Sequence, residues 1–98
     1  MATGTGTATV DFGSTPTEIA TATVTGQAGI AVGDHVECYF VGDDFTADNP
    51  VDVHKWVLPT FVRPVANALV AGTGFTITLL SQFQLTGQVK VRWVWATA

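Results

Sequence analysis

The sequence predicts an all-β fold: an antiparallel β-sandwich, with the jelly roll as one candidate arrangement, and one short helix. Short segments in which apolar and polar residues alternate recur along the chain, which is the period of a half-buried strand. Turn residues separate these segments about every eight to twelve residues, as in sandwiches and small barrels. The 98 residues fit one domain, so residues 1–98 are expected to form a single β-sandwich.

Several segments of the first half follow this pattern. The first strand is expected over residues 7–12, and the Gly-Ser-Thr-Pro run at 13–16 ends it. A second strand is expected over about 18–26, with its alanines toward the core and its threonines toward solvent. A short strand at 30–32 and a stronger one at 35–41 follow.

The helix is expected to begin at Pro50 and to end near Leu58, after an acidic loop. Proline suits the first position of a helix, where an N–H would have no partner within the helix. Val53, Trp56 and Val57 then have i, i+3, i+4 spacing, which predicts that one helical face buries all three. The proline that follows Leu58 should end the helix.

The last third carries the clearest strands. The chain is expected to be extended over 61–71, with a break at Pro64. Residues 75–80 and 89–95 alternate between two faces, and a Thr-Gly pair between them supplies a turn. Two adjacent runs joined by a short polar link predict an antiparallel hairpin.

Residues 1–7 are almost entirely threonine, glycine and alanine. They have no bulky apolar side chain after Met1, so they contribute little burial to a core. We therefore expect either an edge strand or a flexible arm that becomes ordered only on assembly, when its backbone pairs with a neighbouring sheet.

The composition points to contacts with other subunits. Hydrophobic residues make up 47% of the chain, and the mean hydropathy is +0.35. Charged residues make up 12%, about half the usual share for a soluble domain. A core this small cannot hide all of the apolar excess, so self-association is expected.

The charge balance argues against two classes of partner. The net charge is −4, with four lysine and arginine residues. Nucleic-acid surfaces and anionic membranes both require clustered cations, so neither is expected as a partner. No signal peptide and no membrane-spanning run is visible, and the single Cys38 fits synthesis in a reducing cytoplasm.

Two clusters of polar residues invite a chemical interpretation. Asp43, Asp44, Asp48 and Asp52 precede His54, but their spacing lacks the alternate positions and the mid-loop glycine of a calcium loop. Carboxylates that favour the helix N-terminus explain them better, so no metal is expected.

The second cluster is His35, Glu37 and Cys38. On a strand, His35 and Glu37 share one face and Cys38 lies on the other. A zinc site would need more ligands, and His54 alone remains as a candidate. A nucleophile pair of Cys38 with His54 has no supporting signature, so neither catalysis nor a cofactor is expected.

The aromatic residues are the strongest candidates for contact with a partner. Trp93 and Trp95 share a strand face with Val89 and Val91, which favours packing in a core or a subunit interface. The alternative is an exposed row of rings that binds a sugar. The candidate interface or ligand aromatics are Trp56, Trp93, Trp95 and Tyr39.

Several short motifs resemble those of small structural proteins of tailed bacteriophages. They follow a start rich in Thr, Gly and Ala and cover most of the chain: Val10 to Gly13, Val24 to Ala28, Asp52 to His54, Gly72 to Ile77, Leu85 to Gly87 and Val91 to Trp95.

The resemblance implies a β-sandwich module of the virion, made in the cytoplasm of the bacterial host. We expect a capsid decoration or cement subunit, or a related head or tail component, bound to a phage capsid or tail protein. The resemblance also favours a trimer, because capsid sites often have local threefold symmetry, and it brings no catalytic residues. The alternative is a carbohydrate-binding module of a phage fibre.

Overall fold

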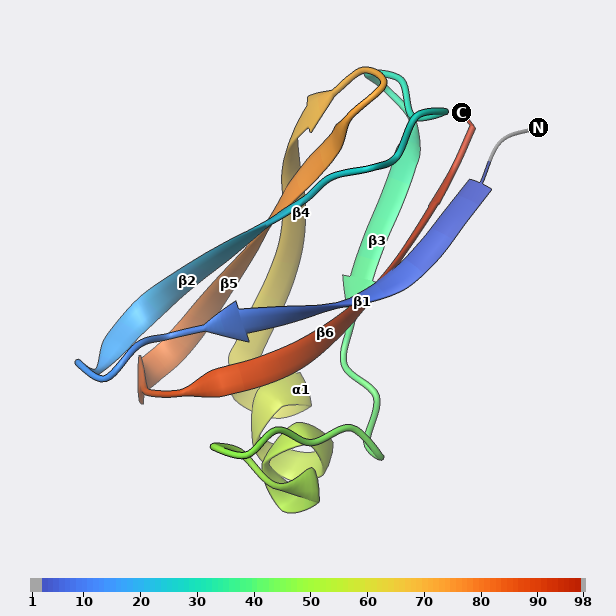
Figure 1. The fold of residues 1–98 in the computed structure, drawn as a ribbon. Helices are drawn as coiled ribbons and strands as arrows, with labels where there is room; N and C mark the ends of the chain where they lie inside the picture. Colours follow the sequence, from blue (N-terminus) through green and yellow to red (C-terminus); the bar gives the residue numbers. More distant parts are fainter. Residues whose placement is uncertain (1–2, 98) are drawn as a thin grey trace.

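The structure is a computed structural model that describes residues 3–97. It contains two three-stranded antiparallel sheets, which form the two layers of a sandwich (Figure 1). Sheet A has the order β1 (Thr3–Asp11), β6 (Gln88–Ala96), β3 (His35–Tyr39), and sheet B has the order β2 (Thr17–Val24), β5 (Gly74–Leu85), β4 (Val62–Val70). The predicted all-β sandwich with a short helix is therefore confirmed.

The strands form one antiparallel ribbon that is rolled into two layers. β1 pairs with β6 and β2 with β5, while β3 lies beside β4. Consecutive strands therefore belong to different sheets, except β4 and β5, which form a hairpin. An eight-stranded jelly roll winds in the same way, so this order is a six-stranded version of that arrangement.

The hairpin expected between residues 75–80 and 89–95 does not form. β5 pairs with β2 and β4, whereas β6 pairs with β1 and β3. The turn at Gly87 carries the chain from sheet B to sheet A, and the Phe12 N–H donates to the Gly87 carbonyl at 2.9 Å. Alternation determines which face of a strand is buried, but it does not determine which strand lies beside it.

β1 begins earlier than expected. It pairs with β6 along its whole length, from Thr3 opposite Ala96 to Asp11 opposite Gln88. Residues 3–7 are thus an edge strand within the chain and not an arm that waits for assembly. The first two residues of the expected arm lie outside the described residues.

Tryptophan rings explain why the Thr-Gly-Thr-Gly segment is ordered. Gly6 lies opposite Trp93 and Gly4 opposite Trp95. A Cβ added at Gly6 would lie 2.5 Å from Cζ2 of Trp93, and one at Gly4 would lie 2.3 Å from Nε1 of Trp95. Large rings on one strand can cover glycines on its neighbour. The burial that residues 3–7 lack in their own side chains is supplied by the indoles of β6.

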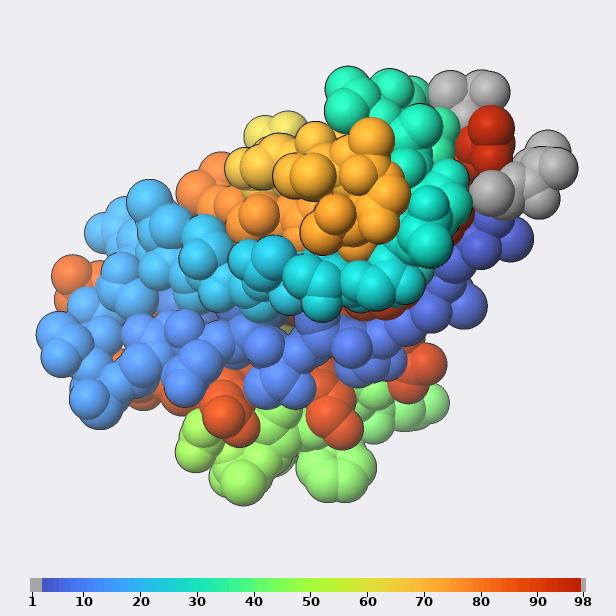
Figure 2. All heavy atoms as spheres, turned by 45° about the horizontal axis from the view of Figure 1, so that its top comes forward, coloured from blue at the N-terminus to red at the C-terminus, as the bar shows by residue number. Residues whose placement is uncertain are grey.

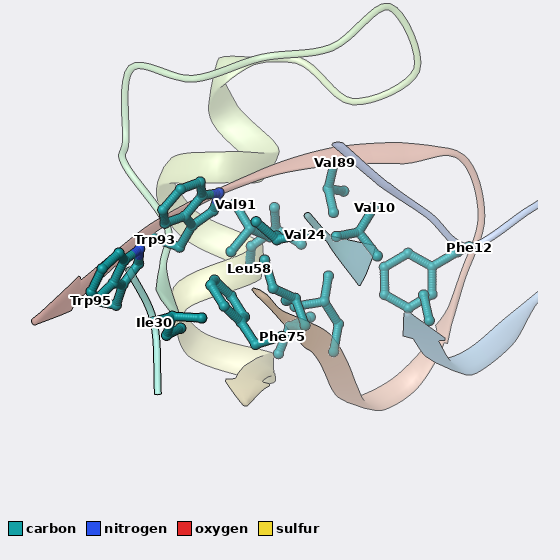
Figure 3. Close-up of a cluster of buried hydrophobic side chains, with 14 residues drawn as sticks. Val10, Phe12, Val24, Ile30, Leu58, Phe75, Val89, Val91, Trp93 and Trp95 are labelled. Carbon is teal, nitrogen blue, oxygen red and sulfur yellow. The ribbon is translucent and has the colours of Figure 1, made fainter. Parts of the chain in front are cut away.

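The core lies between the two sheets (Figure 3). Trp93 of sheet A and Phe75 of sheet B meet edge to face, with ring centroids 5.5 Å apart. The buried apolar residues are Val10, Phe12, Ala20, Val24, Ile30, Leu58, Val62, Phe75, Ile77, Leu79, Val89, Val91, Trp93 and Trp95. Phe12 and Ile30 are the loop residues of this set, and residues 30–32 do not form the expected short strand.

The helical segment is present but differs from the prediction in two ways. It consists of a π-helical turn, η1 (Val53–Val57), followed directly by α1 (Leu58–Phe61). Pro59 does not end it, because Pro59 occupies the first turn of α1, where no N–H is required.

The buried face of this segment is also not the predicted one. His54 and Leu58 are fully buried, whereas Trp56 is 65% exposed. The buried pair has i, i+4 spacing, but a histidine at the first position hides that face from a pattern based on apolar residues.

β4 continues through Pro64, where a break was expected. β4 is an edge strand of sheet B, so one side of it needs no ladder hydrogen bonds. A bulge follows, in which Ala68 has a φ of 54° and the register with β5 shifts. The proline and the bulge both protect this edge against pairing with a further strand.

Candidate interaction surface

Trp93 and Trp95, two of the four aromatic candidates, lie in the core. They are 6% and 3% exposed, and Figure 3 shows their rings side by side above Phe75 and Ile30. The indole N–H of Trp95 donates to Oε1 of Gln27 at 2.9 Å. These two rings therefore do not form an exposed platform for a sugar.

Trp56 and Tyr39 are the exposed candidates, and they lie on different elements. Trp56 projects from η1, with the Nζ of Lys55 5.4 Å from the centroid of its ring. Tyr39 ends β3 and is 42% exposed. It lines a shallow groove of about 450 Å³ between the unpaired edges of β3 and β4.

The acidic loop completes an edge of sheet A. β3 pairs with β6 only from Arg92 onward, so the backbone of Gln88 on that side has no strand partner. The carbonyl of Gln88 instead accepts hydrogen bonds from the Thr46 hydroxyl and the Asn49 amide, both at 2.6 Å. The backbone N–H of Gln88 donates a hydrogen bond to the Asp48 carboxylate at 2.9 Å. Side chains of the loop thus take the place of a longer β3.

His54 also binds the backbone of β6, two residues further along the strand than Gln88. Its Nε2 accepts a hydrogen bond from the Lys90 N–H at 2.9 Å, and its Nδ1 lies 3.2 Å from the Pro50 carbonyl. These partners fit the neutral ring with its proton on Nδ1. Both ring nitrogens are occupied by backbone groups, so His54 is not placed as a base for Cys38.

Asp44 fastens the same loop through an ion pair. Its carboxylate accepts hydrogen bonds from Nη2 and Nε of Arg92, at 2.8 and 3.0 Å. These hydrogen bonds and the positive charge of Arg92 lower the pKa of Asp44, although burial of the carboxyl opposes the shift. Within residues 3–97, no group of three or more His, Cys, Asp or Glu side chains is arranged to hold a metal ion.

Cys38 is half-buried on β3. Burial raises the pKa of its thiol to about 11, so it is a neutral thiol near pH 7. His35 and Glu37 lie on the opposite face of the strand, with their side chains largely exposed and Nε2 3.9 Å from Oε1. The structure therefore does not bring these three residues together.

The outer face of sheet B carries apolar side chains that no helix or strand within residues 3–97 covers. Ile19, on β2, is 57% exposed, and its cross-strand neighbour Leu80, on β5, is 41% exposed. Beside them Phe61 and Phe83 meet edge to face, with centroids 5.1 Å apart. A hollow of about 530 Å³ adjoins this face, lined from Pro59 through Pro64 and from Leu80 through Gln82.

Sequence reasoning identified the threonine side of β2 as a solvent face but missed this aromatic pair. Ser81 bonds to the backbone of Phe83, and the register between β2 and β5 shifts at this bulge. The shift brings Phe83 to the ring of Phe61. The apolar run from Ile77 to Leu80 was visible in the sequence, but the bulge after it was not.

A second group of exposed apolar residues lies on the lobe formed by residues 42–61. This lobe projects beyond the strands at one side of the molecule (Figure 2). It exposes Phe45, Val51 and Trp56, and the Nζ of Lys90 lies 5.3 Å from the centroid of the Phe45 ring. Cations over two of these rings keep part of the lobe polar.

No family model, curated protein or solved structure matches this chain. None of the helices between residues 3 and 97 has the length and apolar character needed to cross a membrane.

Proposed function

We propose that this chain is a non-enzymatic structural subunit that assembles through its exposed apolar surfaces, as a virion protein of a tailed bacteriophage. The observation that carries the proposal is the group of Ile19, Phe61, Leu80 and Phe83 at one end of sheet B. Contiguous exposed apolar residues of this kind mark protein interfaces more often than isolated ones do.

The distribution of polar side chains supports the same function. The polar residues most suggestive of chemistry bind backbone groups or one another: Asp48 and His54 hold β6, and Asp44 holds Arg92. Such bonds make a small sandwich rigid. A rigid module with apolar patches suits a particle in which many modest contacts are multiplied by symmetry.

The resemblance to phage structural proteins supplies the class of particle. It favours a decoration or cement subunit, or another head or tail component, and the proposal therefore takes the virion as the location of the protein. The exposed rings of Trp56 and Tyr39 remain as contact residues for a capsid or tail protein in this proposal.

Immunogold electron microscopy tests the proposal. Antibodies against the chain should label phage particles released from cells that carry the gene, at regular positions on the head or tail. Particles that lack label, from cells in which the protein is produced, would contradict it. The carbohydrate-binding alternative predicts instead that glycans shift the fluorescence of the exposed Trp56.

A further inference from the structure

The outer face of sheet B is nearly free of charge. Its outward positions form three cross-strand rows, fixed by the pairing of β5 with β2 and β4: Ile19–Leu80–Arg63, Thr21–Thr78–Val65 and Thr23–Thr76–Asn67. Arg63 is the only charged side chain among them. The remaining side chains are threonines, one asparagine and aliphatic residues.

This face differs from the rest of an acidic chain. The sequence has eight aspartate and glutamate residues and a net charge of −4. Within sheet B the acidic residue is Glu18, and it precedes the outward-facing Ile19. Two copies that met through the acidic loop would bring the carboxylates of Asp43, Asp48 and Asp52 together, whereas two outer faces of sheet B would not.

The geometry points to a second copy of this chain as the occupant: we infer that two copies pack sheet B against sheet B, about a twofold axis that runs along β5. This inference rests on the proposed assembly function and names the surface that serves it. Face-to-face packing of two sheets about 10 Å apart is the ordinary way to bury such a face.

The central row is complementary to itself under this symmetry. A twofold axis along the central strand places Leu80 against Leu80 of the second copy, and Ile19 against Arg63. In this arrangement the aliphatic stem of Arg63 in one copy covers Ile19 of the other copy, while the guanidinium of Arg63 reaches solvent at the rim of the interface. The two arginines lie on opposite sides of the axis, so they do not face each other.

The size of the face predicts a weak dimer. Three strands about 4.8 Å apart, taken over the 8 residues of β2 at about 3.3 Å per residue, give roughly 400 Å² per copy, which is about half of a standard stable interface. We therefore expect a weak and readily reversible dimer, which is suited to contacts repeated in a particle.

Sedimentation velocity between about 10 µM and 1 mM tests the inference, and Leu80 is the position to change. Both Leu80→Lys and Leu80→Glu should weaken self-association at least tenfold, because each places like charges opposite one another. An equimolar mixture of the two variants should restore it. Val32→Lys is the matched control, since Val32 is 73% exposed and lies in a loop away from this face.

Circular dichroism is the control for folding. The spectra of both Leu80 variants should match that of the wild type, because the Leu80 side chain is exposed. A wild-type chain that stays monomeric up to 1 mM would overturn the inference, as would association that Leu80→Lys leaves unchanged. A trimer insensitive to Leu80 would also overturn it. Each of these outcomes leaves the proposed function intact if immunogold label is found on virions.

Discussion

Replacement of Gly6 by alanine tests whether the tryptophan rings of β6 require glycine in β1. The added Cβ would lie 2.5 Å from Cζ2 and 2.8 Å from Cε2 of Trp93. Ordinary contact between carbons begins near 3.4 Å, so the indole must move by about 1 Å. It cannot do so freely, because Phe75 packs against it from the opposite sheet.

The expected magnitude follows from two opposing effects. Overpacking in a well-packed core costs about 1–3 kcal/mol. The loss of glycine's freedom in the unfolded chain returns about 0.4–1 kcal/mol. We therefore expect Gly6→Ala to lower the free energy of unfolding by about 1–2 kcal/mol, which corresponds to a melting temperature lower by about 5–15 °C in a domain of this size.

Thermal unfolding followed by circular dichroism measures this effect, and Gly42→Ala is the matched control. A Cβ at Gly42 would make an ordinary contact 3.5 Å from Cγ of Lys55, so that substitution should leave the melting temperature equal or higher. The double variant Gly6→Ala with Trp93→Phe should lose less stability than the sum of the single changes, because the smaller ring leaves room for the methyl group. Equal melting temperatures for Gly6→Ala and Gly42→Ala would refute the reasoning.

Four further predictions follow from the core, the first strand, the ion pair and the thiol. Trp93→Ala should cost about 3–5 kcal/mol in urea unfolding, as for large-to-small core changes, and an unchanged midpoint would show that the ring is not a core anchor. Deletion of residues 2–7 should destabilise the monomer itself, because it removes half of β1 from its pairing with β6; a circular dichroism melt identical to that of the full chain would contradict this. Asp44→Asn should lower stability at neutral pH, and the difference from the wild type should shrink as the pH falls below the carboxyl's ordinary pKa of 3.8. The sign follows because Arg92 lowers the pKa of Asp44 in the folded state, so its stabilisation is present above that range and is lost on acidification. Cys38, with a pKa of about 11, should react with iodoacetamide at pH 8 far more slowly in the folded chain than in urea, and equal rates would show that the thiol is not buried.

The faces of the strands could be predicted from the sequence. Alternation placed Ala20, Ala22 and Val24 on the core side of β2, and it aligned Trp93 and Trp95 on one face of β6. All of these contact or form the core in the structure. This succeeds because the side-chain period of a strand is a local property.

The partners of the strands could not be predicted in the same way. Nothing in the pattern of β5 and β6 states that they belong to different sheets, since a two-residue turn serves a hairpin and a crossing equally well. Residues 3–7 are ordered because they pack against the tryptophan rings of β6, which lie about ninety residues further along the chain. The apolar residues of the segment itself therefore could not predict that it forms a strand.

The candidate surface was only partly visible for a related reason. The spacing of apolar residues predicts a buried Trp56, but the buried side chain is that of His54. The ring nitrogens of His54 have backbone groups of Pro50 and Lys90 as hydrogen-bond partners, and apolar spacing does not indicate such contacts. Phe61 and Phe83 meet through a bulge in β5. Both features depend on contacts between segments that are distant in the sequence.

The pairing of the first strand with the last determines the order in which the chain can fold. The β4–β5 hairpin joins neighbouring segments and can form as soon as both have left the ribosome, and β2 can then add to β5. Sheet A has β6 at its centre, so β1 and β3 remain without their hydrogen-bonded partner until β6 has been synthesised. Nascent chains on neighbouring ribosomes would therefore expose unpaired β1 and β3 together, and the speed with which β6 closes sheet A would set the yield of soluble protein.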